Sequence, residues 1–547
     1  MINSKRLIGW VSEPLKYTEY SEAVISEQNL ETTIEVTCWK GDRGFAKIDL
    51  LSCENLDAVK LSSEGFSNDI QITLHHIKDI YAHDIQKQIP DILYTQQPIG
   101  MQANRIYSVW VDIEVAPTAA DGVHNGKICI SAGNDIVTID VQVDVLNILL
   151  PENTTYLELW QYPYTSNRYY SKGTVSDPKP DTMPEIYGTH LDDTYDQQLL
   201  SQIELYKKAG GSAVTVTVTE DPWNWQTPDP YPSMVKWVKN KNGSFSFDYT
   251  DFDKWVAMNE KCGVSGPILS FSIVNWGNNF TYFDEESGNV ITQSYPIGSE
   301  DWCNIWTIFL TDYMKHTMET GVFHRVYIAM DERRYEQVKE ALDVIESVRN
   351  DKGEAFRVSL AVYTFDCEEL FDRIHSLSFT HYIDMNKMMD IIQSRNEQGL
   401  ITTLYTCGDK GSSLVNQPYQ GLDTMWYIAR CNATGFLRWA LDAFNAQPLE
   451  TSYHRLFASG DINLIYPGDV GSDSVCTRSS VRYEMIAAGC RDITKIKFIK
   501  NKYPAHAKDV QDILDSISVA SERDARYKNI IAARKAFDLL TSKLIGK

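Results

Sequence analysis

Apolar and polar residues alternate along residues 32–150, and turn-forming residues separate the alternating runs. A period of two is typical of β-strands that bury one face and expose the other. Pro117, Gly122 and Gly126 supply turn chemistry between two of the clearest runs. We therefore predict an N-terminal antiparallel β-sandwich domain over residues 1–152.

The pattern changes after residue 152, where short apolar runs are separated by longer stretches with helical periodicity. Strands that alternate with helices are typical of βα units and a parallel sheet. About eight such units in about 290 residues match the count and size of a (β/α)8 TIM-type barrel, which we predict over residues 153–450. The predicted strands are 156–162, 213–219, 266–274, 325–330, 357–364, 380–385, 401–407 and 435–441.

Residues 451–547 are predicted to close the barrel and extend it. The run RLFASGDINLIYPG, residues 455–468, predicts a short hairpin or extra strand. Residues 507–544 have the periodicity of one or two amphipathic helices.

In a barrel the chemistry gathers where the strands end, because the loops that follow the strands converge at one face. Aromatic and carboxylate side chains stand at many of these predicted ends. Indole rings pack against the apolar C–H faces of a pyranose, and acids and amides bond its hydroxyls, so this combination favours a sugar ligand. The candidates are Trp160, Asn275, Trp276, Asp331, Glu332, Asp384, Tyr405 and Trp439, with Trp223 and Trp225 as further aromatics.

Asp331 and Glu332 directly follow the apolar run of the fourth predicted strand. An acidic first turn at an exposed helix N-terminus is the alternative to a catalytic pair. Retaining glycosidases with a carboxylate nucleophile place their two acids about 5–5.5 Å apart, and inverting enzymes about 6.5–9.5 Å. The seventh strand offers Tyr405 and no carboxylate nearby except Asp409, so a separate carboxylate nucleophile is poorly supported.

The remaining arrangement lets a 2-acetamido group of the substrate act as the nucleophile. Asp331 would accept the acetamide N–H and orient the carbonyl oxygen toward the anomeric carbon. Glu332 would act as general acid and then as general base. Tyr405 is expected to hydrogen-bond the acetamide oxygen.

At these residues the chain resembles glycoside hydrolase family 123. The likeness rests on the adjacent Asp331 and Glu332 and on three later runs, YTC at 405–407, GFLRW at 435–439 and GDINLIYPG at 460–468. It implies an exo-acting, retaining β-N-acetylgalactosaminidase that acts on glycolipid-type glycans with substrate assistance. Asp331 would then orient the acetamide, Glu332 would be the acid/base, and Tyr405 and Trp439 would line the pocket.

Two positions depart from the pattern that the family commonly shows. The sixth strand has Asn386 two residues after Asp384, where an Asp-x-Trp run is usual, and Arg438 precedes Trp439 where an aromatic is often found. We expect an aromatic that contacts the leaving group to be missing, and the preference for the aglycone stays open. The choice of galactosamine over glucosamine rests on the resemblance alone.

Charge and composition limit the classes of binding partner and cofactor that we expect for this chain. The formal net charge of -23 argues against nucleic acid or an anionic membrane surface, because both are bound by clustered Lys and Arg. The ten cysteines have no paired spacing, which predicts reduced thiols, and His75, His76 and His83 lack the spacing of a zinc site. We expect no metal and no cofactor.

An export signal and a membrane-spanning run are not evident, so a cytoplasmic location is expected. Two alternatives to a glycosidase remain: a non-catalytic carbohydrate-binding barrel and a metal-dependent hydrolase. If the chain is a glycosidase, it could instead hydrolyse another 2-acetamido sugar, such as N-acetylglucosamine. The sequence does not predict the oligomeric state or the role of the sandwich at the substrate entrance.

Overall fold

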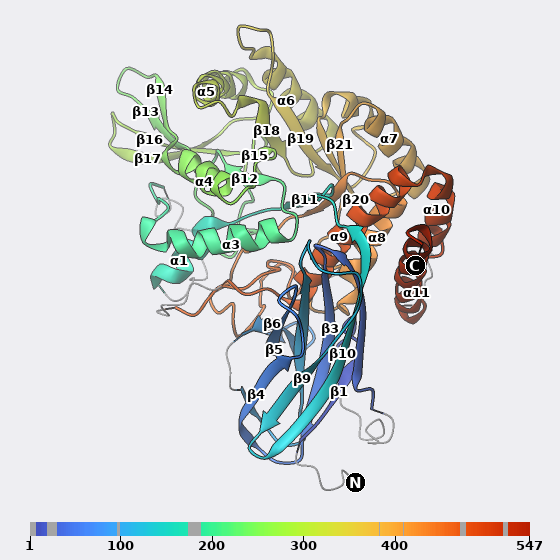
Figure 1. Ribbon diagram of the computed structural model, residues 1–547. Coiled ribbons are helices and arrows are strands. Elements are labelled where there is room, and N and C mark those ends of the chain that lie inside the picture. Colours follow the sequence, from blue (N-terminus) through green and yellow to red (C-terminus); the bar gives the residue numbers. More distant parts are fainter. Residues whose placement is uncertain are drawn as a thin grey trace. The chain divides into compact units, whose positions relative to one another are not determined.

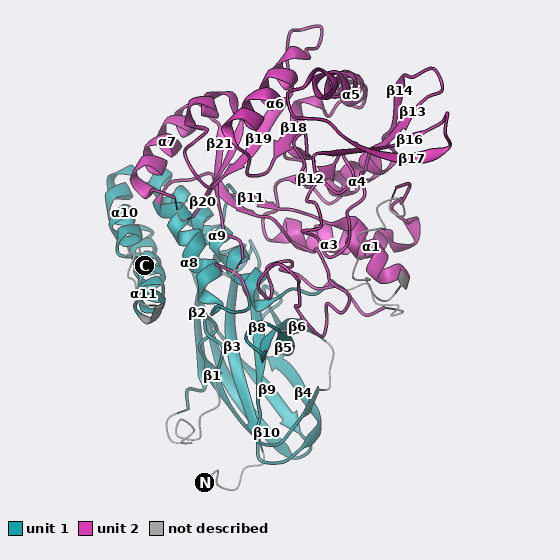
Figure 2. Ribbon diagram, turned by 180° about the vertical axis from the view of Figure 1, so that it is seen from behind, with its two compact units in different colours: residues 1–154, 414–430, 478–547 teal, residues 155–413, 431–477 magenta. Residues whose placement is uncertain are grey.

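The computed structural model describes residues 7–18, 30–95, 99–172, 187–381, 383–408, 410–470, 477–517 and 523–546. The chain divides into two compact units (Figure 2). Unit 1 comprises residues 1–154, 414–430 and 478–547, and unit 2 comprises residues 155–413 and 431–477. Segments distant in sequence therefore fold together in both units.

Unit 1 contains the predicted sandwich (Figure 1). Its two sheets have five described strands each, and every pairing is antiparallel except that of β10 with β2. Alternate residues of the strands, such as Ile139, Val141 and Val143 of β10, are fully buried in the shared core. One sheet has the order β1 (Leu7–Ser12), β3 (Arg43–Ser52), β8 (Ile106–Val115), β5 (Ile70–Ala82) and β6 (Lys87–Tyr94), and the other β2 (Thr33–Lys40), β10 (Asp135–Leu149), β9 (Gly122–Ala132), β4 (Leu56–Glu64) and β7 (Ile99–Met101).

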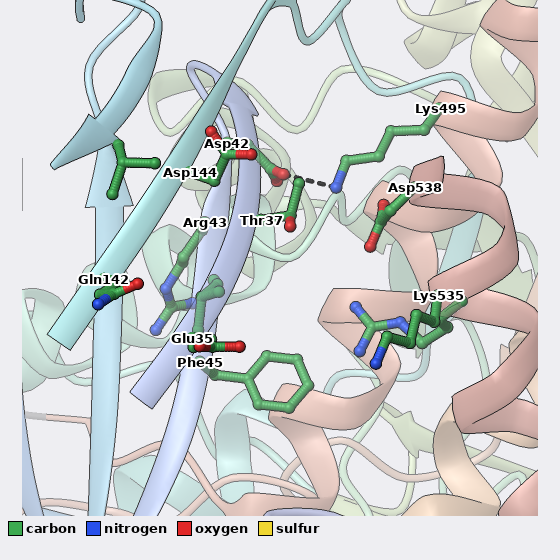
Figure 3. Close-up of a pocket in the computed structure, with 14 residues that line it drawn as sticks. Glu35, Thr37, Asp42, Arg43, Phe45, Gln142, Asp144, Lys495, Lys535 and Asp538 are labelled. Carbon is green, nitrogen blue, oxygen red and sulfur yellow. Dashed lines mark ion pairs between the residues drawn. The ribbon is translucent and has the colours of Figure 1, made fainter. Parts of the chain in front are cut away.

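Among its described residues, unit 1 also has four α-helices: α8 (Tyr419–Arg430), α9 (Val481–Lys502), α10 (Ala507–Asp515) and α11 (Arg523–Leu544). The last two confirm the helices predicted over residues 507–544. Charged residues of α9 and α11 and of β2, β3 and β10 line a polar cavity of about 560 Å³ (Figure 3). In it the Lys495 ammonium lies 2.5 Å from Oδ2 of Asp42, and the Asp42 side chain is 1% exposed.

Unit 2 contains the predicted barrel. Its eight strands form one parallel sheet, which is nearly closed because the Ser212 N–H donates to the Leu157 carbonyl oxygen at 2.9 Å, beside a parallel bridge between Leu157 and Gly211. The sheet order is β11 (Tyr156–Leu159), β22 (Gly435–Arg438), β21 (Ile401–Tyr405), β20 (Ser376–Thr380), β19 (Arg357–Val362), β18 (Val326–Met330), β15 (Ile268–Phe271) and β12 (Val214–Thr217).

The described helices of unit 2 follow the strands in the order that a barrel requires. A separate small sheet, in the order β14, β13, β16, β17, was not predicted. Its members are β13 (Lys236–Lys239), β14 (Phe245–Asp248), β16 (Asn279–Asp284) and β17 (Asn289–Ser294), and the helices are α1 (Pro163–Lys172), α3 (Asp196–Lys208), α4 (Thr250–Lys261), α5 (Glu300–Glu319), α6 (Tyr335–Ser347) and α7 (Met385–Glu397).

Two predicted elements differ in the structure. The sixth strand is Ser376–Thr380 and not 380–385, because Ser376 and Ser378 are buried polar residues in the sheet while the chain leaves it after Thr380. The predicted hairpin or strand at 455–468 is an irregular segment, in which Asn463 forms an antiparallel bridge with Asp442.

Candidate active site

The adjacent acids stand where β18 leaves the barrel. All five residues of β18 are buried, and Asp331 and Glu332 follow them as half-buried side chains before α6 begins. Oδ1 of Asp331 accepts the Glu332 backbone N–H at 2.9 Å, and Oδ2 accepts the indole N–H of Trp276 at 2.9 Å. Both carboxylate oxygens of Asp331 thus accept a hydrogen bond, which fixes the orientation of the carboxylate.

Glu332 is held by a residue from another strand. The hydroxyl of Tyr405, at the end of β21, donates a hydrogen bond to Oε1 of Glu332. Burial raises the pKa of Glu332 above its ordinary value, although the Tyr405 bond and the nearby Arg333 act in the opposite direction. Burial and the charge of Glu332 hold the pKa of Tyr405 far above its usual range, so the phenol keeps its proton.

A cavity of about 170 Å³ opens on these acids. Ligand pockets for drug-sized molecules are usually about 300–1,000 Å³, so this volume suits a single sugar ring better than an extended glycan. Among the described residues of its wall, Asp331 and Glu332 are the only carboxylates. The wall is made of Trp160, Trp223, Gln226, Trp276, Asp331, Glu332, Ala361, Tyr405, Thr406, Cys407, Leu437, Trp439 and Phe457.

Three of the wall tryptophans donate their indole N–H to a carboxylate. Trp160 donates to Glu158 at 2.8 Å, Trp276 to Asp331 at 2.9 Å, and Trp439 to Asp461 at 2.9 Å. Burial raises the pKa of Glu158 to about 7. These bonds fix the plane of each ring, so the rings form preoriented apolar surfaces for a sugar.

Arg438 supports this wall from behind. Its side chain is 0% exposed, and it lies 2.6 Å from Oδ1 of Asp461, whose other oxygen accepts from Trp439. It also donates to the Thr406 carbonyl oxygen at 3.2 Å. Arg438 is therefore a buried support for Trp439.

Six of the eight predicted site residues line the cavity, and two do not. Asn275 bonds within its own loop, because its amide donates to the Asn279 carbonyl oxygen at 2.7 Å and its oxygen accepts the Asn279 N–H at 3.0 Å. Asp384 caps α7, where its Oδ1 accepts the backbone N–H groups of Asn386 and Lys387 at 3.0 and 3.2 Å. Asp409 lies outside the described residues.

Six wall residues were not predicted, among them Ala361 of β19 and Leu437 of β22. Thr406 and Cys407 directly follow β21, so a stricter use of the strand-end rule would have found them. Gln226 and Phe457 come from irregular loops, and no sequence pattern indicates where such loops run.

The described residues contain no group of three or more His, Cys, Asp or Glu side chains arranged to hold a metal ion. None of the described helices is both long and apolar enough to cross a membrane.

Comparisons with known proteins place the chain in a family. A model of the glycoside hydrolase 123 catalytic domain matches residues 160–499, and a model of the glycoside hydrolase 123 N-terminal domain matches residues 10–132. A solved family 123 glycoside hydrolase from Clostridium perfringens, described in connection with glycolipid glycan hydrolysis, is similar at 29% identity with a TM-score of 0.89, over 99% of each chain.

More distant structures include a Bacteroides ovatus GH5 xyloglucanase, at 10% identity with a TM-score of 0.30 over 88% of this chain and 100% of the other. A search of curated proteins gave no significant match. The match to the catalytic domain includes the barrel strands except β11, and it includes the acids, indoles and tyrosine of the cavity. The chain belongs to glycoside hydrolase family 123, and it is a glycosidase with a sandwich and a TIM-type barrel.

Proposed function

We propose that this glycosidase is an exo-acting, retaining β-N-acetylgalactosaminidase that uses the acetamide of its substrate as the nucleophile. The observation that carries the proposal is the pair Asp331 and Glu332, the only carboxylates among the described residues of the cavity wall. A mechanism with a carboxylate nucleophile needs a second acid across the sugar from the general acid. With both acids on one side, the substrate has to supply the nucleophile.

Asp331 would accept the acetamide N–H and turn the carbonyl oxygen toward the anomeric carbon. That oxygen forms a bond to C1 while the bond from C1 to the leaving oxygen breaks, which gives a cyclic oxazolinium ion (a protonated oxazoline) whose N–H stays hydrogen-bonded to Asp331. The negative Asp331 stabilises the positive charge that develops on the ring nitrogen and carbon. Because Trp276 and the Glu332 N–H already hold its two oxygens at 2.9 Å each, the carboxylate is oriented before substrate binds.

Glu332 would donate a proton to the leaving oxygen as the glycosidic bond breaks. Water then attacks C1 from the side that the aglycone left, Glu332 takes the proton of that water, and the oxazoline reopens with net retention. A general acid has to be protonated at the working pH, and burial favours this form by raising the pKa of Glu332.

Tyr405 was expected to bond the acetamide oxygen, and its hydroxyl instead donates to Glu332. We propose that the main role of Tyr405 is to orient the Glu332 carboxyl through this hydrogen bond. When Glu332 is protonated, the phenol O–H can instead donate a hydrogen bond to a substrate oxygen.

The Clostridium perfringens relative is described with glycolipid glycan hydrolysis, and we propose the same substrate class for this chain. The small cavity supports removal of one terminal sugar at a time. The galactosamine preference is supported by the resemblance to the family.

The test is the initial rate on the p-nitrophenyl β-glycosides of N-acetylgalactosamine, N-acetylglucosamine and galactose, with the Glu332→Gln protein as control. Turnover of the first sugar alone is expected. Equal turnover of galactose would contradict substrate assistance, because galactose has no acetamide. A preference for N-acetylglucosamine would support the proposed mechanism but contradict the proposed specificity for galactosamine. Binding of N-acetylgalactosamine without turnover of any glycoside would favour a binding barrel.

A further inference from the structure

Arg333, which follows the two acids, contacts the tryptophan that bonds the first of them. Its guanidinium carbon lies 3.9 Å from the centre of the Trp276 ring. The same guanidinium donates to the Val274 carbonyl oxygen at 2.8 Å and to the Glu332 carbonyl oxygen at 2.7 Å. Arg333 is thus fixed between the β15 loop, which carries Trp276, and the end of β18, which carries the acids.

Trp276 differs from the other two tethered indoles in how much of it is packed. Trp160 is 2% exposed and Trp439 is 9% exposed, whereas Trp276 is 41% exposed. Neighbouring side chains hold the first two rings in place. Trp276 is partly open to solvent, and its ring is held by the Arg333 stack and by the hydrogen bond to Asp331. An exposed ring without such contacts would change rotamer on the picosecond to nanosecond timescale.

We propose that Arg333 is a positioning residue that clamps Trp276, so that the indole N–H stays on Asp331 and keeps this carboxylate turned toward the acetamide. This inference rests on the proposed function, because it assigns a role in the same site. Arg333 does not line the cavity, so it acts through Trp276 and not on the sugar.

The chemistry of arginine suits this clamp. A planar guanidinium stacks on an indole face and still donates in its own plane, whereas a lysine ammonium cannot do both. The two carbonyl bonds hold the guanidinium in place over the Trp276 ring. Arg333→Lys therefore keeps the charge beside the two acids and loses the stack.

The test is a double-mutant cycle on the turnover of p-nitrophenyl N-acetyl-β-galactosaminide by Arg333→Gln, Trp276→Phe and the double variant. Misplacing a reacting group by about 1 Å can lower the rate by about 100-fold. We expect each single variant to lower kcat by about 10- to 100-fold, and Arg333→Gln to change KM by less than about 3-fold, since it removes orientation and no sugar contact. Because Arg333 acts through Trp276, the double variant should be no slower than the slower single variant.

Arg333→Lys should be as slow as Arg333→Gln. Arg334→Gln is the matched control, since Arg334 is the next residue, is exposed and lies outside the cavity wall; it should retain wild-type kcat. Multiplicative effects in the double variant, full activity of Arg333→Gln, or rescue by lysine would overturn the clamp. Thermal melts of all variants exclude loss of fold as the cause.

A second measurement separates this inference from the proposed function. The tryptophan fluorescence of the wild type minus that of Trp276→Phe gives the contribution of Trp276. Arg333→Gln should increase the quenching of this contribution by acrylamide. If the wild-type protein turns over none of the glycosides, the proposed function fails, but the quenching result still tests whether Arg333 holds Trp276 in place. Unchanged quenching would overturn the clamp even in an active enzyme.

Discussion

The Tyr405 hydroxyl donates a hydrogen bond to Oε1 of Glu332, although 73 positions separate the two residues in the chain. They stand at the ends of β21 and β18, with β20 and β19 between them in the sheet. The bond therefore crosses the mouth of the barrel and joins the proposed general acid to the opposite wall of the cavity. Its loss should change the protonation of Glu332 and leave the core of the barrel intact.

Tyr405→Phe tests this connection. The hydrogen bond favours the ionised form of Glu332 and so lowers its pKa, which burial raises. Without the bond the pKa should rise further, and Glu332 should stay protonated to higher pH. The basic limb of the kcat/KM profile is expected to move to higher pH, measured over about pH 4 to 9. A basic limb that stays in place or moves to lower pH would contradict the assignment of Glu332 as the acid.

Glu332→Gln should lower turnover in a way that depends on the leaving group. A general acid contributes about 10²- to 10⁴-fold to the rate, and a good leaving group needs less protonation. We expect the full loss on a methyl or sugar aglycone and a smaller loss on 2,4-dinitrophenol. Equal losses on all three would show that Glu332 acts in another way. Glu336 offers a control, since it lies in the first turn of α6 outside the cavity wall.

Asp331→Asn should instead lower the rate for every leaving group by a similar factor. The substitution removes the charge that stabilises the cyclising acetamide, and one preorganised electrostatic contact is worth about 10²- to 10³-fold. The comparison uses the same three glycosides. An N-trifluoroacetyl substrate gives a check, because its weaker carbonyl nucleophile should slow the wild-type enzyme strongly. Wild-type rates that ignore this change would contradict substrate assistance.

The buried ion pair of unit 1 predicts a stability effect. Burial would raise the pKa of Asp42, but Lys495 and Arg491 outweigh burial and lower it. Removing one partner of a buried pair destabilises by about 3–5 kcal/mol, so Lys495→Met should reduce the free energy of unfolding in urea by about that amount. Lys535→Met is the control, because Lys535 lines the same cavity and is exposed (Figure 3). It should change stability by less than about 0.5 kcal/mol.

The same pair predicts a dependence on pH. Because the pKa of Asp42 is lowered in the folded protein, its stabilising contribution is present above the ordinary aspartate pKa and is lost as the pH falls through the folded value. The free energy of unfolding should therefore fall on acidification more steeply in the wild type than in Asp42→Asn. Parallel curves for the two proteins would show that Asp42 makes no such contribution.

Much of the fold could be predicted from periodicity, because strands buried on both faces are nearly continuous apolar runs. The run from Val326 to Met330 is one, and it led directly to Asp331 and Glu332. The sixth strand failed this rule because Ser378 is buried with its hydroxyl bonded to Thr403 at 2.6 Å. A serine satisfied by a neighbouring strand looks in sequence like a loop residue, and the strand was placed too late.

The contacts within the site could not be predicted, because they join residues far apart in the chain. Trp276 and Asp331 are 55 positions apart, and Arg438 and Asp461 are 23 apart. Nothing in the sequence around Arg438 indicates that its charge is met by a buried aspartate. The strand-end rule gathers such residues at one face of the barrel, but the pairing among them depends on side-chain packing that only coordinates show.

The occupied N–H groups of Trp160, Trp276 and Trp439 limit what these rings can distinguish. An indole whose N–H is already hydrogen-bonded offers a ligand a flat apolar surface and no free hydrogen-bond donor. Such surfaces can bind the ring of a hexose, but they do not distinguish an axial hydroxyl from an equatorial one. Stereochemical discrimination in this enzyme must therefore come from the few polar groups between the rings, and attempts to redesign its sugar preference should begin there and leave the tryptophans unchanged.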